Sequence, residues 1–220
     1  MKKIFLIFAI IFGFMFILPA TSAKADVMPY YVSSINSNTI GVYQVPHEIK
    51  IYKEPNEQSP MAVNVYWDSK NYECINTASS NLFVVFLPEK DLGFIQVLDE
   101  SEDETWVKVL YDRNSNKTGW IKKEDDFRFL PWRIFFSWYG HKYGLYYMKD
   151  APDNTKSMFG STEDNAKEIG RVTVPDKVNV TSIRGNWALV NAYDVDRLTK
   201  IGWIKWRDIN GEIYLFPNIK

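Results

Sequence analysis

Short runs of alternating apolar and polar residues, separated by turn-forming residues, are the most regular pattern in the chain. In residues 106–111 every second side chain falls on one face, and residues 112–117 supply turn chemistry before the apolar run resumes at residues 120–121. Residues 187–204 repeat this arrangement. Each stretch predicts a β-hairpin, whereas only residues 161–167 have a composition that favours a helix.

The two hairpins belong to a longer internal repeat. Four short blocks occur in the same order in both halves, and a domain of about 80 to 90 residues in each half would account for them. Gly119 and Gly202 stand where the last strand of each half is expected to begin, a position that suits a bulge or a sharp bend. The blocks are Lys53-Glu54-Pro55 with Lys149-Asp150-Ala151-Pro152, Leu87-Pro88-Glu89-Lys90 with Val174-Pro175-Asp176-Lys177, Trp106-Val107-Lys108-Val109 with Trp187-Ala188-Leu189-Val190, and Gly119-Trp120-Ile121-Lys122 with Gly202-Trp203-Ile204-Lys205.

The first 25 residues have the pattern of an export signal. Lys2 and Lys3 precede an apolar run over residues 4–18, and Ala23-Lys24-Ala25 is a small-x-small cleavage pattern. The alternative is an uncleaved membrane anchor, although Pro19 and the small residues after it favour cleavage. We therefore expect a secreted or periplasmic protein of the cell envelope, with no stable membrane insertion once the signal is removed.

Charge and composition exclude several classes of function. The formal net charge is −1, and removal of the three lysines of the signal makes it more negative, so nucleic acid is not an expected partner. Cys74 is the only cysteine, so we expect no internal disulfide; it is either a small buried apolar residue or a reactive thiol. His47 and His141 lie in no recognisable catalytic motif and, with one cysteine, form no metal-ligand set. We expect no catalytic residue, no metal and no cofactor.

Two acidic stretches leave one further alternative open. Residues 99–104 and 124–126 are rich in Asp and Glu. They are expected to be solvated turns on either side of the first hairpin, and a calcium site is the alternative interpretation.

The recurring Trp-x-x-Val and Gly-Trp-Ile motifs resemble the bacterial SH3-like domain, SH3b. The resemblance covers roughly residues 41–130 and 143–217 and is most specific over the closing hairpin; residues 49–52 and 145–148 depart from the Asn-Val-Arg triplet that the family commonly carries. It implies an all-β fold of two small SH3-like β-barrels in tandem after an N-terminal signal peptide. Exported SH3b domains often accompany a wall-cutting peptidase or amidase, but two barrels leave no length here for such a domain.

The expected organisation has five parts, and residues 132–142 are too apolar for a free linker. We expect this connector to pack between the barrels and fix their angle. The parts are a signal peptide (1–25), an N-terminal lead-in (26–40), a first SH3b-like domain with an inserted hairpin (41–131), the aromatic connector (132–142) and a second SH3b-like domain (143–220).

The aromatic residues supply the candidate binding site. Trp106 and Trp187 are expected in the core or at its margin, because a small barrel needs large side chains to fill it. Trp120 and Trp203 alternate with inward isoleucines and so are expected to face an exposed groove. The same expectation holds for four aromatics near the early loop, where ligand grooves of this family tend to lie: Trp67, Tyr72, Tyr146 and Tyr147.

An aromatic groove beside acidic turns suits a cationic or peptidic ligand. The sequence therefore favours a non-catalytic exported binding module that recognises peptidoglycan or a cell-wall peptide. The alternative is a scaffold whose barrels pack on an exported partner protein and which has no wall ligand. An enzyme is a third hypothesis, which His141 beside Cys74 would support.

Overall fold

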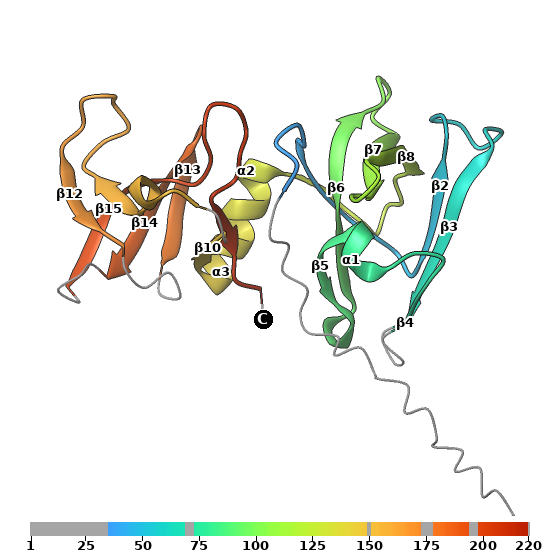
Figure 1. The fold of residues 1–220 in the computed structure, drawn as a ribbon, viewed down its shortest axis with the longest axis horizontal. Helices are drawn as coiled ribbons and strands as arrows, with labels where there is room; N and C mark the ends of the chain where they lie inside the picture. The colour runs from blue at the N-terminus through green and yellow to red at the C-terminus, as the bar shows by residue number, and fades with distance from the viewer. Residues whose placement is uncertain (1–34, 69–72, 149–150, 173–177, 194–197, 220) are drawn as a thin grey trace, which may run out of the picture.

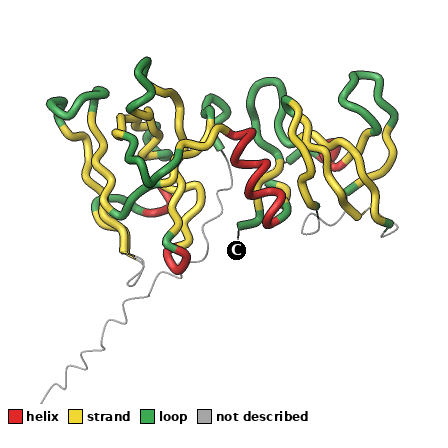
Figure 2. The backbone as a smooth tube through the Cα atoms, turned by 180° about the vertical axis from the view of Figure 1, so that it is seen from behind, coloured by secondary structure: helices red, strands yellow, loops and turns green. Residues whose placement is uncertain are grey.

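The computed structural model describes residues 35–219, except residues 69–72, 149–150, 173–177 and 194–197. The predicted signal peptide and most of the lead-in therefore lie outside the described part. Two groups of strands lie side by side along the long axis, and a short helical segment lies between them (Figure 1). The same arrangement is seen from behind in Figure 2.

The first group of strands forms one antiparallel sheet. Its order is β4-β3-β2-β8-β7-β6-β1-β9, and β5 also pairs with β6. The turns α1 (Ser79–Leu82) and η1 (Pro88–Lys90) flank β5. The strands are β1 (Gly41–Gln44), β2 (Glu48–Tyr52), β3 (Met61–Asp68), β4 (Glu73–Ile75), β5 (Phe83–Leu87), β6 (Leu92–Glu100), β7 (Trp106–Asp112), β8 (Lys117–Lys122) and β9 (Phe129–Pro131).

The second group forms a five-stranded sheet, β12-β11-β15-β14-β13, and a two-stranded sheet, β10-β16. The turn η3 (Asp153–Lys156) precedes β11. The all-β class predicted from the sequence is confirmed, while closure into SH3-like barrels stays a prediction. The strands are β10 (Leu145–Tyr147), β11 (Ser157–Phe159), β12 (Glu168–Arg171), β13 (Asn179–Arg184), β14 (Trp187–Tyr193), β15 (Thr199–Lys205) and β16 (Leu215–Pro217).

Strand order repeats between the two groups. The order β3-β2-β8-β7-β6 matches β12-β11-β15-β14-β13, and the pair β1-β9 matches β10-β16. The repeated Gly-Trp-Ile-Lys blocks thus lie on the equivalent strands β8 and β15. The first block does not mark equivalent places, because residues 53–55 follow β2 whereas residues 151–152 follow β10.

The extra material of the first group differs in part from the inserted hairpin expected from the sequence. Strands β3 and β4 do pair as a hairpin, with Trp67 opposite Cys74. However, β3 also pairs with β2 and has β12 as its counterpart. The added elements are therefore β4, α1 and β5.

Each repeated glycine lies inside its strand, and not at the strand start as expected. A Cβ on Gly119 would lie 2.5 Å from Ile51 Cγ2 of β2, and a Cβ on Gly202 would overlap Met158 of β11. These are the places where the neighbouring strand comes nearest, because Tyr52 pairs with Trp120 and Phe159 with Trp203. Glycine is needed there to admit a close neighbouring strand.

Helical structure occupies the connector and not residues 161–167, which form bends and turns. The segment runs through α2 (Trp132–Phe135), the π-helical turn η2 (Phe136–Gly140) and α3 (His141–Tyr143), and ends at Gly144, whose φ of 76° suits a helix end. Its aromatic residues have only moderate helix propensity, so packing stabilises the helix.

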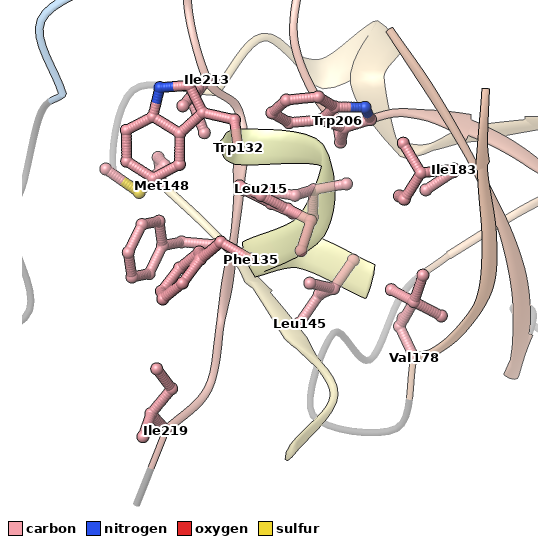
Figure 3. Packing of buried hydrophobic residues seen from close by; sticks show 14 of the residues in the cluster. Trp132, Phe135, Leu145, Met148, Val178, Ile183, Trp206, Ile213, Leu215 and Ile219 are labelled. Carbon is pink, nitrogen blue, oxygen red and sulfur yellow. The ribbon is translucent and has the colours of Figure 1, made fainter. Parts of the chain in front are cut away.

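The aromatic face of this segment joins the two groups of strands. The Phe135 ring lies 5.3 Å from Phe94 of β6 and 5.5 Å from Phe216 of β16. The Phe136 ring lies 4.3 Å from Trp206, which follows β15. One buried cluster contains all of these residues, and Figure 3 shows part of it around Phe135 and Trp206. A second cluster lies within the first group of strands alone. The predicted packing of the connector between the two halves is confirmed.

Among the described residues, none of the helical segments has the length and apolar character needed to cross a bilayer.

Replacing Phe136 by alanine is expected to lower the free energy of unfolding by about 3–5 kcal/mol, because the ring is fully buried between elements of the shared core. Urea denaturation measures this change. Trp138→Ala on the same segment is the control, since that side chain is 50% exposed and its loss should change stability by about 0.5 kcal/mol or less. Equal losses in the two variants would contradict the proposed role of the segment.

Candidate functional site

A cleft opens between β2 and β8. The two strands pair through Tyr52 and Trp120 and then diverge, leaving a surface cavity of about 500 Å³. Ile49 and Ile121, both buried, are among the residues that line it. A cavity of this size is within the range that accommodates a small ligand or a short length of chain.

Main-chain groups of β2 face the cleft. The Trp67 amide donates to the His47 carbonyl at 2.9 Å, and the Lys53 amide donates to the Pro60 carbonyl, so odd-numbered residues of this strand bond toward β3. Because bonding directions alternate along an antiparallel strand, the amides and carbonyls of Glu48 and Lys50 point the opposite way, toward β8.

The opposite wall has the matching arrangement. The Lys123 amide donates to the Thr105 carbonyl on the β7 side, so the main-chain groups of Lys122 face β2. The next amide, that of Glu124, donates to the Tyr43 hydroxyl at 2.9 Å. The cleft is thus bounded by two strand edges whose hydrogen-bonding groups point into it.

Side chains of both charges surround the cleft. Glu48 accepts hydrogen bonds from Asn64 and Tyr66, and these bonds, led by the one from Asn64, lower the pKa of Glu48. Lys50 lies 3.5 Å from the same carboxylate. On the other wall Lys122 pairs with Glu57 at 3.0 Å. The presence of both carboxylates and amino groups around the cleft suits a ligand that carries both an amino and a carboxylate group.

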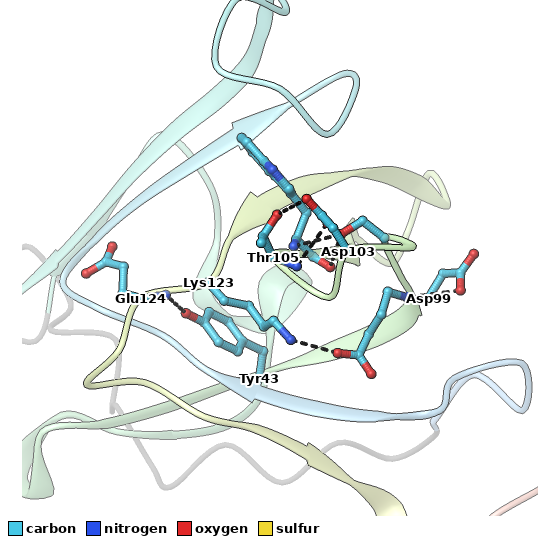
Figure 4. A network of polar contacts seen from close by, with 9 residues as sticks. Tyr43, Asp99, Asp103, Thr105, Lys123 and Glu124 are labelled. Atoms are coloured by element: carbon cyan, nitrogen blue, oxygen red, sulfur yellow. Dashed lines mark hydrogen bonds and ion pairs between the residues drawn. The ribbon is translucent and has the colours of Figure 1, made fainter.

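An ordered acidic turn lies near Lys123, one of the residues that line the cleft (Figure 4). Asp103 accepts hydrogen bonds from the Ser101 hydroxyl at 2.6 Å and from the amide and hydroxyl of Thr105. The bond from Ser101 is the largest cause that lowers the pKa of Asp103 to about 2. Lys123, which lines the cleft, pairs with Glu100 at 2.8 Å. The turn fixes negative charge beside the cleft.

Burial also changes the pKa of Tyr43, whose hydroxyl contacts Glu124 at the edge of the cleft. Its side chain is fully buried in the core of the first sheet, and burial raises the pKa of Tyr43 to about 12. The hydroxyl therefore stays neutral at ordinary pH and holds the backbone at Glu124 in place through the bond from its amide.

Trp120 and Trp203 occupy equivalent positions and are half-buried. The Lys108 amino group lies 5.8 Å from the Trp120 ring centroid, and the Arg184 guanidinium lies 5.9 Å from the Trp203 ring centroid. The structure does not bring the two tryptophans together, since they lie on different sheets. Trp120 adjoins the cleft through its pairing with Tyr52.

Trp67 does not face a groove, contrary to expectation. Only 4% of it is exposed, its indole NH donates to the Pro46 carbonyl, and its ring stacks on His47 at 4.2 Å. It lies on the same face of β3 as buried Val65, so the alternation of that strand turns the indole toward the core. Tyr72, another predicted site residue, lies outside the described residues.

Tyr146 and Tyr147 are half-buried and pack against the shared core. Burial raises the pKa of Tyr147 above its ordinary value. Both residues lie on β10, which pairs with β16 and not with the strand that carries Trp203. They therefore do not join the first cleft.

Trp106 is buried, as expected, and Trp187 is half-buried at the core margin. Each packs edge-on against an aromatic residue of the neighbouring strand: Tyr52, which pairs with Trp120, or Phe159, which pairs with Trp203. The Trp106 and Tyr52 rings are 5.5 Å apart, and the Trp187 and Phe159 rings are 5.6 Å apart.

His141 and Cys74 are not adjacent. His141 lies in α3 and contacts the Val180 carbonyl at 3.0 Å, whereas β4, which carries Cys74, is the outermost strand of the first sheet (Figure 1). Within the described ranges, no three His, Cys, Asp or Glu side chains come together in a way that could hold a metal ion.

The charged residues of the cleft were not predicted from the sequence. One signal was available: in residues 48–52 the polar residues Glu48, Lys50 and Tyr52 alternate with two buried isoleucines. This stretch includes one departure from the SH3b triplet, residues 49–52, of which Ile49, Lys50 and Tyr52 line the cavity.

Comparisons with known proteins give little further information. No protein-family model matches the chain, and no curated protein matches it. Among solved structures, an NlpC/P60 endopeptidase from Photobacterium damselae subsp. piscicida is similar over 84% of this chain, at 10% identity and a TM-score of 0.22. The chain covers 35% of that protein's chain, and a similarity this low carries no argument.

Asp103→Asn is expected to lower the melting temperature at pH 6 but not at pH 2. The folded-state pKa lies below the ordinary 3.8, so the ionised carboxylate stabilises the fold above about pH 4, and this contribution is lost as the pH falls toward about 2. Thermal unfolding followed across this range measures the difference, with exposed Asp125→Asn as the control. A difference that is the same at both pH values would refute the role of the turn's hydrogen bonds.

Proposed function

We propose that the protein is a non-catalytic, exported binding module of the SH3b type that recognises peptidoglycan through its cell-wall peptides. The observation that carries this proposal is the cleft, in which edges of two diverging strands present main-chain groups to a cavity of about 500 Å³. An extended peptide is the ligand that can pair with such edges, because its own amides and carbonyls repeat at the same spacing.

The charges at the cleft favour a peptide over a neutral sugar. Glu48 and Glu57 offer carboxylates, and Lys50 and Lys122 offer amino groups. Wall peptides carry free amino and carboxylate groups, so both kinds of side chain would find a partner. The acidic turn at residues 99–104 places extra negative charge beside one end, which favours the amino end of the ligand there.

A protein scaffold of the envelope is the second candidate function. It is favoured by Ile134 and Trp138, which lie four residues apart on the helical segment and are 37% and 50% exposed. Two exposed apolar side chains one turn apart can dock on a partner protein, and this face is separate from the cleft.

Lys50→Glu is expected to weaken binding of the chain from residue 26 onward to purified peptidoglycan by about tenfold or more, since it replaces a cleft cation by an anion. Co-sedimentation measures the bound fraction. Lys117→Glu is the matched control, because Lys117 pairs with Asp112 at the β7–β8 turn and does not line the cleft.

Glycan strands stripped of their peptides provide the second comparison. The proposal requires that the wild-type chain bind intact peptidoglycan and lose that binding on stripped strands. If the folded wild-type chain does not bind intact peptidoglycan, the wall-binding function is refuted, and the scaffold function is the remaining candidate.

A further inference from the structure

The outer face of the five-stranded sheet carries an apolar surface that lies apart from the cleft. Residues directly opposite one another on neighbouring antiparallel strands share a face, and the pairs Leu189–Trp203 and Trp187–Lys205 are opposite in β14 and β15. We call this surface the second outer face; its apolar members are Phe159, Trp187, Leu189, Ile201 and Trp203.

Comparison of equivalent positions shows that this surface is not a general property of the fold. Leu189 and Ile201 stand where the first sheet has Lys108 and Thr118, since these residues occupy the same places relative to the repeated Gly-Trp-Ile-Lys blocks and their partner strands. Ile201 is 65% exposed. The second sheet therefore exposes apolar side chains where the first has polar ones.

Two cations flank this surface in one row across the strands. Arg184 of β13 is opposite Trp187, and Trp187 is opposite Lys205 of β15. The Lys205 amino group lies 5.0 Å from the Trp187 ring centroid, and the Arg184 guanidinium lies over Trp203. Contact with the indoles orders both side chains before any ligand arrives.

Neither cation is neutralised by an acidic side chain within the described part of the chain. In the first group of strands, by contrast, Lys50, Lys117 and Lys122 each lie within 3.5 Å of a carboxylate. Among the described strands of this sheet the one acidic residue is Glu168 on β12, two strands from Lys205, and it interacts with Arg171. Within the described ranges, the second outer face therefore combines apolar contact area with positive charge that no carboxylate pairs.

The size of the surface decides between a protein and a narrow chain as the occupant. Four strands at about 4.8 Å spacing and five residues at about 3.4 Å rise cover roughly 330 Å². A stable protein–protein interface needs about 800 Å² on each partner. A narrow linear molecule that carries negative charge and has apolar ring faces fits the surface better.

We propose that the second outer face binds an acidic polysaccharide. Carboxylate or phosphate groups on the sugar chain would accept charge-assisted hydrogen bonds from Arg184 and Lys205, while the apolar sides of the sugar rings pack on Trp203, Leu189 and Ile201. This inference does not rest on the peptide cleft, which lies on the other sheet.

Polygalacturonate, which has one carboxylate on every sugar ring, is the probe, and retardation in native gels that contain the polymer measures its affinity. The double variant Arg184→Gln, Lys205→Gln should bind about tenfold more weakly than the wild type. The double variant Lys108→Gln, Lys117→Gln removes the same charge from the first sheet and should bind as the wild type does. Equal losses in both double variants would overturn the proposal.

Two further polymers separate the contributions that the carboxylates and the sugar rings make to binding. Methyl-esterified polygalacturonate keeps the rings without the charge, and polyglutamate keeps the charge without the rings. Both should bind about tenfold more weakly than polygalacturonate. If polyglutamate bound as tightly as polygalacturonate, ionic attraction alone would explain the binding, and the proposed polysaccharide site would be refuted.

A variant that adds a cation gives the sharpest test. Leu189→Lys with Ile201→Thr gives the second outer face the residues found in the first sheet, and it raises the positive charge by one. Weaker binding of polygalacturonate is expected, because the apolar contact is lost, whereas stronger binding would contradict the proposal. Lys50→Glu in the cleft should leave polygalacturonate binding unchanged, so failure of either site can be recognised separately.

Discussion

The structure depends on the packing of one aromatic helical segment between two groups of strands. Phe135 contacts both Phe94 and Phe216, which belong to different sheets, and Phe136 packs on Trp206. The buried residues of the second group belong to the same cluster as this segment. The first group of strands has, in addition, a separate buried cluster of its own. The two halves are therefore unequal: the first can fill part of its interior alone, and the second relies on the connection.

This inequality bears on where binding can occur. In the first half the chain leaving β8 continues through Lys123 and Glu124 beside the open cleft. At the position equivalent to Lys123 the second half has Trp206, whose side chain is fully buried and whose indole NH donates to the Gly185 carbonyl. The residue that follows β15 thus packs in the core that joins the two halves. In the second half the surface that stays exposed is the outer face of the sheet.

Local pattern was sufficient for part of the fold. Alternation predicted the β7–β8 and β14–β15 hairpins, because their pairing depends on neighbouring residues and a turn. The helical segment was not predicted, although Trp132, Phe135, Phe136 and Tyr139 have helical spacing, because strand-like composition on both sides masked a helix that packing stabilises. The cleft was not predicted because it forms between β2 and β8, which are distant in sequence. Trp67 was wrongly assigned to a groove because it lies near the early loop, whereas it shares a face of β3 with buried Val65.

The shared core has a consequence for how such a repeat can change over time. Duplicated domains joined by a free linker can be lost, reordered or copied independently, since each keeps its own interior. Here removal of either half together with the connector would uncover buried rings of the other half: Phe94 in the first, or Phe216 and Trp206 in the second. The two copies therefore depend on each other for stability, and we expect substitutions to be tolerated best on surfaces that face away from the connector.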